Sequence, residues 1–377
     1  MKKKNILILI SNYYPIFGGA EKQAQLQAEK LVQRGHDVTI LTALKDDSRS
    51  NEVINSVRVK RVQYPKIKLV GAFIFYTKIV IHLLVYGGKY DIYHVHMVKN
   101  LAFIASVIGA IQGKNVLLKF TGWWELDLGV LNQIRNKKLK NKLLLWGLKK
   151  ASYYISISNE ITQRAIDAGF TKEKIMYIPN GVDMSLFNRE IAPTVSLSLQ
   201  TVLFVGRLVE EKGLFILLEA WTTVMKEHRD CRLDIVGDGP LRQQLEEMSS
   251  KLAIAEKVRF HGKSENTATH YKSADIYVLP SFHEGLSNTL LEAMASRLPV
   301  VSTKISGTID ILEDGITGFL VKPGSPTELS ESILALLGSK NLREEFGQRG
   351  RNVIQDKFSI ETVVTQLESL YAMGVNP

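Results

Sequence analysis

The chain has 377 residues, of which 45% are hydrophobic and 23% are charged, and its formal net charge is +10. These proportions are typical of globular proteins and exclude a disordered chain, while the length predicts two domains, because single cores rarely exceed about 300 residues. The single cysteine, Cys231, excludes an internal disulfide framework and fits a reducing cytosol. Neither it nor the eight histidines show zinc-ligand spacing, so no metal site is expected.

The positive charge predicts an acidic partner, and the candidates are nucleotide phosphates, nucleic acid and an anionic membrane surface. Nucleic acid fits poorly, since the chain has no recognised nucleic-acid-binding motif. The apolar run that ends at Ile10 is too short for a signal peptide and predicts a buried strand. These observations favour a cytoplasmic protein.

The N-terminal half alternates strands and helices. Strands are predicted over residues 6–10 and 38–42, with a helix over 20–34 between them, which is a Rossmann-like opening with a right-handed crossover. Gly18 and Gly19 precede the helix but do not form the G-x-G-x-x-G array of dinucleotide-binding proteins. A glycine pair at a helix entrance lets the backbone approach a phosphate or a sugar closely, although a plain tight turn would have the same sequence.

The run Leu69–Tyr86 is strongly apolar and long enough to raise the question of a membrane span. Lys78 and His82 interrupt it, and a glycine pair ends it. A spanning helix needs about 20 residues that are mostly uncharged. We therefore predict a helix that packs within the protein.

The strand predicted over 91–96 ends in His94 and His96, which lie two residues apart and share one face of the sheet. A metal site would need a third ligand, and none is nearby. Open α/β sheets bind ligands at the carboxyl ends of their strands, so His96 is a candidate functional residue. A hydrogen-bonded core histidine is the alternative.

The strand predicted over 116–120 opens into a loop with paired tryptophans and two carboxylates. These residues are Trp123, Trp124, Glu125 and Asp127. Aromatic faces cover the C–H patches of sugars, and carboxylates accept sugar hydroxyl protons, so the loop fits a sugar-binding cleft as well as a simple packing cluster. The helix predicted over 133–150 is basic and amphipathic, which favours an anionic membrane surface; a solvated helix face is the alternative.

The segment 191–200 contains proline and serine and is the best domain boundary, because the strand–helix pattern restarts after it. Strands are predicted over 201–205, 232–236, 258–261, 275–280, 299–302 and 319–321, and helices over 214–227, 241–252, 329–337 and 359–373. The fold class is therefore α/β, with two Rossmann-like domains that each contain a parallel sheet. We place the domains at 1–190 and 191–358, with a helix in 359–377 that packs back on the first.

Arg207 and Lys212 lie just beyond a predicted strand, in a loop that leads to a helix. A pyrophosphate carries close to two negative charges, and many transferases neutralise them with a metal held by an Asp-x-Asp motif. The chain has no such motif. An arginine fork, a lysine and a helix N-terminus can do the same work without metal, although Glu210 and Glu211 could simply pair with the two basic residues.

The stretch Ser281–Ala295 leaves a strand, crosses a polar loop and enters a helix that should begin near Ser287 or Asn288. The first turn of this helix would offer backbone N–H groups to an anion. Glu284 lies in the loop and Glu292 eight residues later in the helix, which suits a phosphorylated, hydroxyl-rich ligand. Two surface glutamates beside an ordinary helix are the alternative.

Several motifs occur in a characteristic order. They are Gly18-Gly19, DIYHVH at 91–96, IPNGVD at 178–183, GRLVEEKG at 206–213, VGDGPLR at 236–242 and HEGLSNTLLEA at 283–293. With these motifs the chain resembles the retaining GT-B glycosyltransferases of family four over nearly its whole length. The resemblance implies a donor site in the cleft between two domains and a nucleotide-diphosphate-sugar donor. We expect this donor to be UDP- or GDP-linked, and the resemblance implies no cofactor or metal.

The resemblance also implies roles for individual residues. Arg207 and Lys212 would hold the donor diphosphate, and Glu284 would bind the hydroxyls of the transferred sugar. Glu292 would accept the ribose hydroxyls. Backbone N–H groups would assist at Gly285, Leu286, Ser287 and Asn288, with Gly18 and Gly19 over the phosphates.

One position departs from the family pattern, in which a histidine often ends the strand before the acceptor loop. Thr121 occupies that place here. Either His96 supplies the imidazole near the sugar, or Glu125 or Asp127 takes a polar role, or none is needed. A smaller departure is Asp310, where relatives often carry glutamate.

The expected function is metal-independent, retaining hexosyl transfer to a glycan or lipid-linked glycan in bacterial-type polysaccharide or lipopolysaccharide assembly. The protein would be cytoplasmic, with peripheral contact at the inner face of the membrane as a further expectation. Two alternatives remain open at this point. A nucleotide-sugar 2-epimerase has the same architecture but needs no acceptor, and a non-catalytic sugar-binding subunit would bind without turnover.

Overall fold

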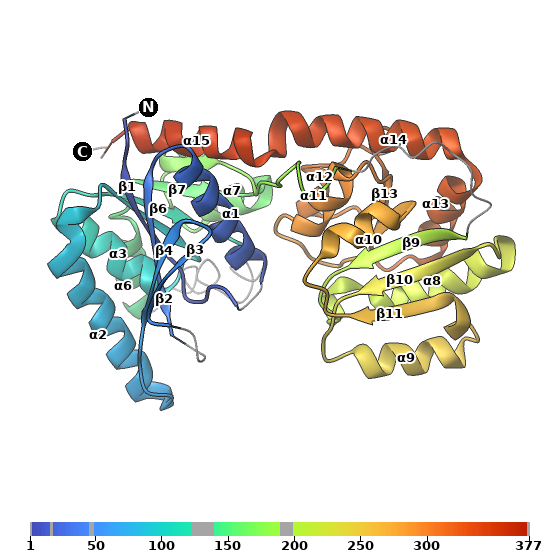
Figure 1. Cartoon of the computed structure of the whole chain (residues 1–377), viewed down its shortest axis with the longest axis horizontal. Helices are drawn as coiled ribbons and strands as arrows, with labels where there is room; N and C mark the ends of the chain where they lie inside the picture. Colours follow the sequence, from blue (N-terminus) through green and yellow to red (C-terminus); the bar gives the residue numbers. More distant parts are fainter. Residues whose placement is uncertain (1, 16–17, 45–48, 123–138, 189–198, 375–377) are drawn as a thin grey trace. The chain divides into compact units, whose positions relative to one another are not determined.

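The computed structural model describes residues 2–15, 18–44, 49–122, 139–188 and 199–374 (Figure 1). It divides into two compact units, Met1–Gly181 with Ile360–Pro377 and Val182–Ser359. The chain therefore leaves the first unit at Gly181, some residues before the expected boundary at 190, and its last helix belongs to the first unit. Each unit holds a largely parallel sheet with helices, which is the predicted fold class.

The first unit contains an eight-stranded sheet in the order β3-β4-β2-β1-β5-β6-β7-β8. Its strands are β1 (Asn5–Leu9), β2 (Asp37–Ala43), β3 (Asn51–Ile54), β4 (Val57–Val62), β5 (Ile92–His96), β6 (Asn115–Lys119), β7 (Tyr153–Ser156) and β8 (Ile175–Tyr177). Neighbouring strands are parallel, except that β3 runs antiparallel to β4 at the sheet edge. The order reverses between β1 and β5, so the carboxyl ends of these two strands flank the switch point of the sheet.

Helices cover both faces of this sheet (Figure 1). Those of the first unit are α1 (Gly19–Gln33), α2 (Lys68–Tyr86), α3 (Asn100–Ile111), α6 (Leu139–Leu148), α7 (Asn159–Asp167) and α15 (Ile360–Ala372). Helix α3 contacts both α2 and α6, whereas α1 contacts α15. The basic helix expected over 133–150 is seen as α6 from residue 139; residues 123–138, with both paired tryptophans, lie outside the described part.

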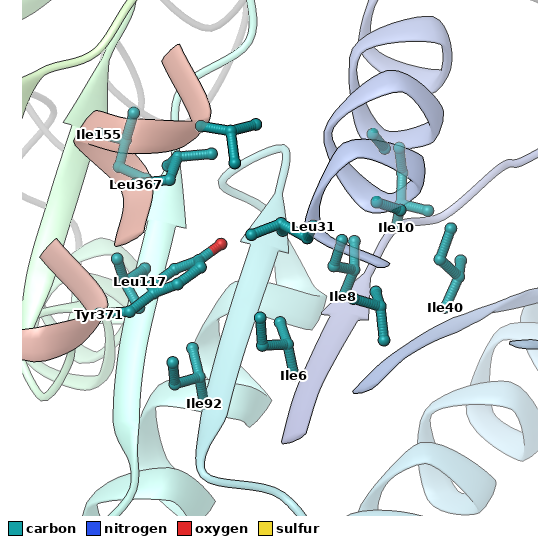
Figure 2. Close-up of a cluster of buried hydrophobic side chains, with 14 of the residues drawn as sticks. Ile6, Ile8, Ile10, Leu31, Ile40, Ile92, Leu117, Ile155, Leu367 and Tyr371 are labelled. Atoms are coloured by element: carbon teal, nitrogen blue, oxygen red, sulfur yellow. The ribbon is translucent and has the colours of Figure 1, made fainter. Parts of the chain in front are cut away.

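The C-terminal helix α15 is part of the core of the first unit. Leu367 and Tyr371 belong to the buried apolar cluster on one face of the sheet, where they lie next to Ile155 and Leu117 (Figure 2). Burying each such side chain contributes about 1.5–3 kcal/mol, which explains why the chain end is held there.

Polar contacts fix both ends of this packing. Gln23 of α1 donates to the Gly181 carbonyl at 2.7 Å and accepts from its N–H at 2.9 Å. At the other end of α1, Arg34 donates to Thr365 and to the Glu361 carbonyl, each at 2.8 Å. Helix α15 is thus joined to α1 by specific hydrogen bonds as well as apolar contact.

The second unit contains a six-stranded parallel sheet in the order β11-β10-β9-β12-β13-β14. Its strands are β9 (Gln200–Val205), β10 (Cys231–Val236), β11 (Val258–Gly262), β12 (Ile276–Leu279), β13 (Val300–Thr303) and β14 (Phe319–Val321). Its helices are α8 (Leu214–Glu227), α9 (Arg242–Lys251), α10 (Thr267–Ser273), α11 (Asn288–Ala295), α12 (Ser306–Ile309), α13 (Pro326–Gly338) and α14 (Lys340–Val353), which continues into a π-helix over Ile354–Phe358. Short 3₁₀ turns occur at Gly87–Lys89, Lys172–Lys174, Glu210–Lys212 and Ala255–Lys257.

The strand order of the second unit reverses between β9 and β12. In open parallel sheets, ligands bind outside the carboxyl ends of the strands at such a reversal. The loop after β9 carries Arg207 and Lys212, and the loop after β12 carries Glu284. The topology therefore places these candidate residues at the position where a ligand is expected.

The packing of α15 gives a stability prediction. Leu367→Ala should destabilise the first unit by about 3 kcal/mol, because it leaves a cavity among fully buried side chains. Ser369→Ala, on the same helix, removes only a hydrogen bond within that helix and should change stability by less than about 0.5 kcal/mol. Urea unfolding followed by circular dichroism measures both, and equal effects of the two substitutions would contradict this role of α15.

Candidate active site

The loop after β9 runs from Gly206 to Gly213 and is shaped at its end by backbone geometry. Gly213 has φ 65°, in the left-handed region, and precedes α8. A Cβ atom at this position would collide with the carbonyl oxygen of Pro280, which follows β12. Gly213 therefore lets the loops after β9 and β12 come into contact beside Lys212. The N–H of Phe282 adds a hydrogen bond to the Glu211 carbonyl at 2.8 Å.

The turn after β10 supports the same loop from the other side. The N–H of Leu208 donates to the Asp238 carbonyl at 3.0 Å, and the N–H of Leu241 donates to the Leu208 carbonyl at 3.1 Å. Side chains at Gly237 or Gly239 would collide with the backbone of the β9 loop. The glycines of the VGDGPLR motif thus allow close backbone contact that holds the loop carrying Arg207.

Lys212 and Glu284 form an ion pair between the loops after β9 and β12. Their side chains are 17% and 11% exposed, so both charges are largely removed from water. The hydroxyl of Ser281 also donates to Glu284, at 2.8 Å, and both bonds end on the same oxygen, Oε1. Among the described residues, no bond is found for the other oxygen, Oε2, which is therefore available to accept from a ligand hydroxyl.

A third loop fixes the backbone of Glu284. Thr303, at the end of β13, donates its hydroxyl to the Ser281 carbonyl, and Gly307 of α12 packs on Glu284. A Cβ atom at Gly307 would lie 2.8 Å from both the Cβ atom and the carbonyl oxygen of Glu284. Sequence reasoning did not single out Thr303 or Gly307, because their contacts with this loop depend on the pairing of β12 with β13.

Arg207 differs from its neighbour Lys212. Its side chain is exposed, and within the described part of the chain its guanidinium has no hydrogen bond or ion pair. The alternative that Glu210 and Glu211 neutralise both basic residues is wrong for Lys212, which pairs with Glu284. An exposed guanidinium in the same loop as Lys212 can make a bidentate contact with a phosphate.

The predicted start of the helix that follows Glu284 is confirmed. Helix α11 begins at Asn288, and Ser287 is its N-cap, whose hydroxyl accepts from the N–H of Leu290 at 3.4 Å. Gly285 and Leu286 lie in the loop just before the cap. These residues place the positive end of the helix dipole next to Glu284.

Glu292 lies inside α11 and is only 3% exposed. It faces two buried tyrosines: burial raises the pKa values of Tyr271 and Tyr277 well above 10, and the Glu292 carboxylate raises both further. Tyr277 is fixed by donating to the hydroxyl of Thr289 at 2.8 Å. The alternative of two surface glutamates is wrong, because neither Glu284 nor Glu292 is exposed.

The remaining candidate residues belong to the first unit. Gly18 is the N-cap of α1 and Gly19 its first residue, and the Glu21 carboxylate folds back onto Gly18. His96 ends β5, the strand next to β1 in the sheet. Both features therefore lie at the switch point of the first sheet.

His96 is completely buried, beside other basic groups. Its ring centre lies 4.7 Å from that of His94, and the sheet register places Lys119 next to it on β6. Burial lowers the pKa of His96 well below 6.5, and His94 and Lys119 lower it further, so the imidazole is neutral at pH 7. Burial also lowers the pKa of Lys119 to about 7.

These buried groups extend what the sequence indicated. No hydrogen-bond partner is found among the described residues for either ring nitrogen of His96 or for Lys119 Nζ. His94 differs, because its Nδ1 lies 2.8 Å from the hydroxyl of Tyr371 on α15. Lys119 received no role from the sequence, although it stands two residues before Thr121. Glu125 and Asp127 lie outside the described residues.

Within the described ranges, no group of three or more His, Cys, Asp and Glu side chains is arranged to hold a metal ion. The site in the second unit thus consists of an exposed arginine, a lysine–glutamate pair, a helix N-terminus and a buried glutamate. This combination suits a ligand with negative charge at one end and hydroxyl groups at the other.

Comparison with known families agrees with this geometry. The model of the family described as "Glycosyl transferases group 1" matches residues 194–353, and that of "Glycosyltransferase Family 4" matches residues 17–186. The chain is a group 1 glycosyltransferase. It is therefore a transferase enzyme, and the predicted resemblance is confirmed, as is the GT-B architecture of two parallel-sheet α/β domains.

Individual relatives of this glycosyltransferase share modest identity. The chain is 24% identical over 372 residues to N-acetyl-alpha-D-glucosaminyl L-malate synthase of Bacillus anthracis, covering 95% of this chain and 94% of that one. It is 31% identical over 171 residues to the lipopolysaccharide core biosynthesis glycosyltransferase LpsE of Rhizobium meliloti, covering 45% and 49%. The structure of Anabaena Alr3699/HepE in complex with UDP and glucose superposes with a TM-score of 0.78 at 19% identity, covering 98% and 99%.

The tight contact at Gly213 gives a prediction. Gly213→Ala should destabilise the second unit by about 2 kcal/mol, since alanine disfavours a positive φ and its Cβ atom meets the Pro280 carbonyl. Gly338→Ala is the matched control, because a Cβ atom there meets nothing within 4 Å. Thermal unfolding measures both variants. Equal stability of the two would show that the glycosyltransferase does not depend on this loop contact.

Proposed function

We propose that this enzyme transfers a hexose from a nucleotide-diphosphate-sugar donor bound at the carboxyl ends of β9 and β12. The observation that carries the proposal is the Lys212–Glu284 pair at the switch point of the sheet, with the exposed Arg207 in the same loop as Lys212. The donor diphosphate would bind Arg207 and Lys212, and a sugar hydroxyl would donate a hydrogen bond to Glu284. The Anabaena relative was crystallised with UDP and glucose, which supports a UDP-linked donor ahead of a GDP-linked one.

In this proposal each residue has one role. Arg207 and Lys212 bind the diphosphate, and Oε2 of Glu284 accepts from a hydroxyl of the transferred sugar. The backbone from Gly285 to Asn288 supplies N–H groups. Glu292 accepts the ribose hydroxyls; because it is buried beside Tyr271 and Tyr277, its carboxylate is already held in one position before the nucleotide binds.

The reaction we propose retains the configuration at the anomeric carbon and needs no metal. The bond from the anomeric carbon to the diphosphate oxygen breaks, and the acceptor oxygen bonds to the same face of the sugar. The leaving phosphate takes the acceptor proton. The main catalytic effect is stabilisation of the charge that develops on the diphosphate, which Arg207 and Lys212 provide.

His96 has a limited role in this proposal. A neutral, fully buried imidazole cannot donate a proton at pH 7 as an imidazolium would. Its ring nitrogens can form hydrogen bonds that help to position the acceptor. Gly18 and Gly19 keep the role that the resemblance implies, which is contact with the donor phosphates. We propose that the first unit binds the acceptor, a glycan or lipid-linked glycan of cell-surface polysaccharide assembly, at the cytoplasmic side of the membrane.

Removal of Arg207 tests the role of the guanidinium. Arg207→Ala should raise the barrier by about 3 kcal/mol and lower kcat more than 100-fold, because phosphate charge grows in the transition state. Arg349→Ala removes an exposed arginine of α14 that pairs with Glu345 and should leave kcat unchanged. Initial rates with UDP-sugars measure both, and an Arg207→Ala enzyme of normal kcat would contradict the proposal.

Metal chelation tests the second part of the mechanism. Since Arg207 and Lys212 supply the positive charge, transfer should proceed at the same rate in EDTA as in Mg²⁺. The measurement is the initial rate after dialysis against EDTA. A rate that disappears in EDTA and returns with Mg²⁺ or Mn²⁺ would overturn metal independence without affecting the family assignment.

A further inference from the structure

Helix α2 packs on the first unit by one face only. Phe75, Ile79 and Leu83 follow one another at four-residue spacing and are 7%, 0% and 0% exposed. The opposite side of the helix is also apolar but lies open. Its exposed side chains are Leu69, Val70, Phe73, Ile81, Leu84 and Val85, at 49–85% exposure, and we call them the α2 face.

This exposure corrects the expectation of a helix packed within the protein. The helix is long and apolar enough to cross a bilayer. Only 22% of its most apolar stretch is buried inside the protein. A soluble protein rarely exposes contiguous apolar side chains of this size, and a helix that is apolar all round is normally covered on all sides. We therefore expect another molecule to cover the α2 face.

The two polar residues that interrupt the run do not oppose an apolar occupant. Lys78 turns its ammonium to the Gln63 carbonyl, at 2.8 Å, and so satisfies one donor outside the helix. The ring of His82 lies beside that of Tyr86, with ring centres 5.0 Å apart and a tilt of 44° between the planes. Burial, followed by the charge of Lys60, lowers the pKa of His82 to about 4, so its ring is neutral at pH 7.

The charged residues of the segment that carries the α2 face are all basic. Lys60 and Lys89 lie over the ring of Tyr86, 5.6 Å and 5.2 Å from its centre, at the end of the helix. Lys66 stands exposed before its start. No Asp or Glu occurs in the sequence between Glu52 and Asp91.

The neighbouring helices extend this pattern. Helices α3 and α6 contain no Asp or Glu, and α3 packs against both α2 and α6 (Figure 1). Leu143 and Trp146 of α6 are 57% and 52% exposed, and Lys150 lies over the Trp146 ring at 5.2 Å. The helices that pack against each other elsewhere in the unit, α1 and α15, carry acidic residues: Glu21, Glu29, Glu361 and Glu368. Apolar, basic and aromatic side chains without acids are what an anionic lipid surface binds.

The packing of α2 decides how it would meet a membrane. Because Phe75, Ile79 and Leu83 anchor it to its own unit, α2 could span a bilayer only by leaving that core. A helix held in this way lies in the plane of the interface, with its outer side chains at the boundary between headgroups and acyl chains.

We infer that the α2 face, with the basic side chains beside it, docks on an anionic lipid bilayer. The apolar side chains enter the interface, and the lysines bind lipid phosphates. The inference deepens the proposed function, and rests on it for the lipid-linked nature of the acceptor, because docking would bring the acceptor-binding unit to the membrane. The docking surface itself is inferred from the exposure of the α2 face and the charges beside it, so it does not depend on the proposed function.

Vesicle co-sedimentation of the full chain tests the docking surface. We expect binding to vesicles that contain phosphatidylglycerol and weak binding to pure phosphatidylcholine. Leu84→Glu combined with Phe73→Glu should lower the partition coefficient roughly tenfold or more, because two carboxylates would enter the interface. Leu186→Glu is the matched control, since Leu84 and Leu186 are both 56% exposed and Leu186 lies in the other unit.

Several outcomes would overturn the inference. Unchanged binding of the Phe73/Leu84 variant would do so, as would equal loss in Leu186→Glu. Both positions are exposed, so folding should persist; if thermal unfolding shows otherwise, Phe73→Ser with Leu84→Ser replaces the variant. A wild-type dimer in sedimentation velocity that the substitutions convert to a monomer would assign the face to a second copy instead.

A fluorescent label tests insertion directly. Cys231 is fully buried, so a Phe73→Cys variant can be labelled selectively with a polarity-sensitive dye. Its emission should shift to the blue on phosphatidylglycerol vesicles, whereas a label at Leu186→Cys should not shift. Binding without any shift at position 73 would show that lysines alone hold the protein and would overturn insertion of α2.

The proposed function is tested separately in the same preparations. Donor turnover with a soluble acceptor should be equal in wild type and in the Phe73/Leu84 variant, because these residues lie outside the donor site. Wild type that binds vesicles but turns over no nucleotide sugar would contradict the proposed function and leave the docking surface intact. Turnover of the nucleotide sugar without vesicle binding would contradict the docking surface and leave the proposed function intact.

Discussion

The ion pair between Lys212 and Glu284 is the interaction on which the proposed donor site depends. It joins the loops after β9 and β12 where the strand order reverses, and both charges are largely shielded from water. Losing either partner would leave the other charge buried and uncompensated. The pair thus holds a cation and a carboxylate in place until a ligand that offers phosphate and hydroxyl groups binds them. The glycines at 213, 237, 239 and 307 allow the backbone contacts that bring these loops together.

Much of this could be predicted from the sequence, because it is encoded locally. Apolar runs and their spacing indicated two parallel α/β sheets, and the helix start was predicted at Ser287 or Asn288 from their residue types and the apolar run behind them. The motif around Glu284 also predicts a phosphorylated, hydroxyl-rich ligand, and this remains a prediction. Which groups meet across loops could not be predicted: the contacts of Lys212 and Gly307 with Glu284 require the order of β9, β12 and β13, which no single segment specifies.

One wrong prediction and one omission have the same origin. The run Leu69–Tyr86 is apolar on every side, so its sequence could not reveal that only Phe75, Ile79 and Leu83 would find a partner. The two-residue spacing of His94 and His96 correctly indicated one shared face, but Lys119 reaches His96 from the neighbouring strand. Burial and His94 lower the pKa of His96, and Lys119 lowers it further because the register of the sheet places Lys119 beside His96, and this register is a property of the fold.

The most direct test of the donor site compares the affinities for UDP and for a UDP-hexose by isothermal titration calorimetry. If Lys212 binds the diphosphate and Glu284 the sugar, Lys212→Met should weaken both ligands. Glu284→Gln should then weaken the UDP-hexose while UDP affinity stays unchanged or rises, since the lysine loses its internal partner. Equal loss of UDP and UDP-hexose affinity in Glu284→Gln, or undiminished UDP binding in Lys212→Met, would contradict the account.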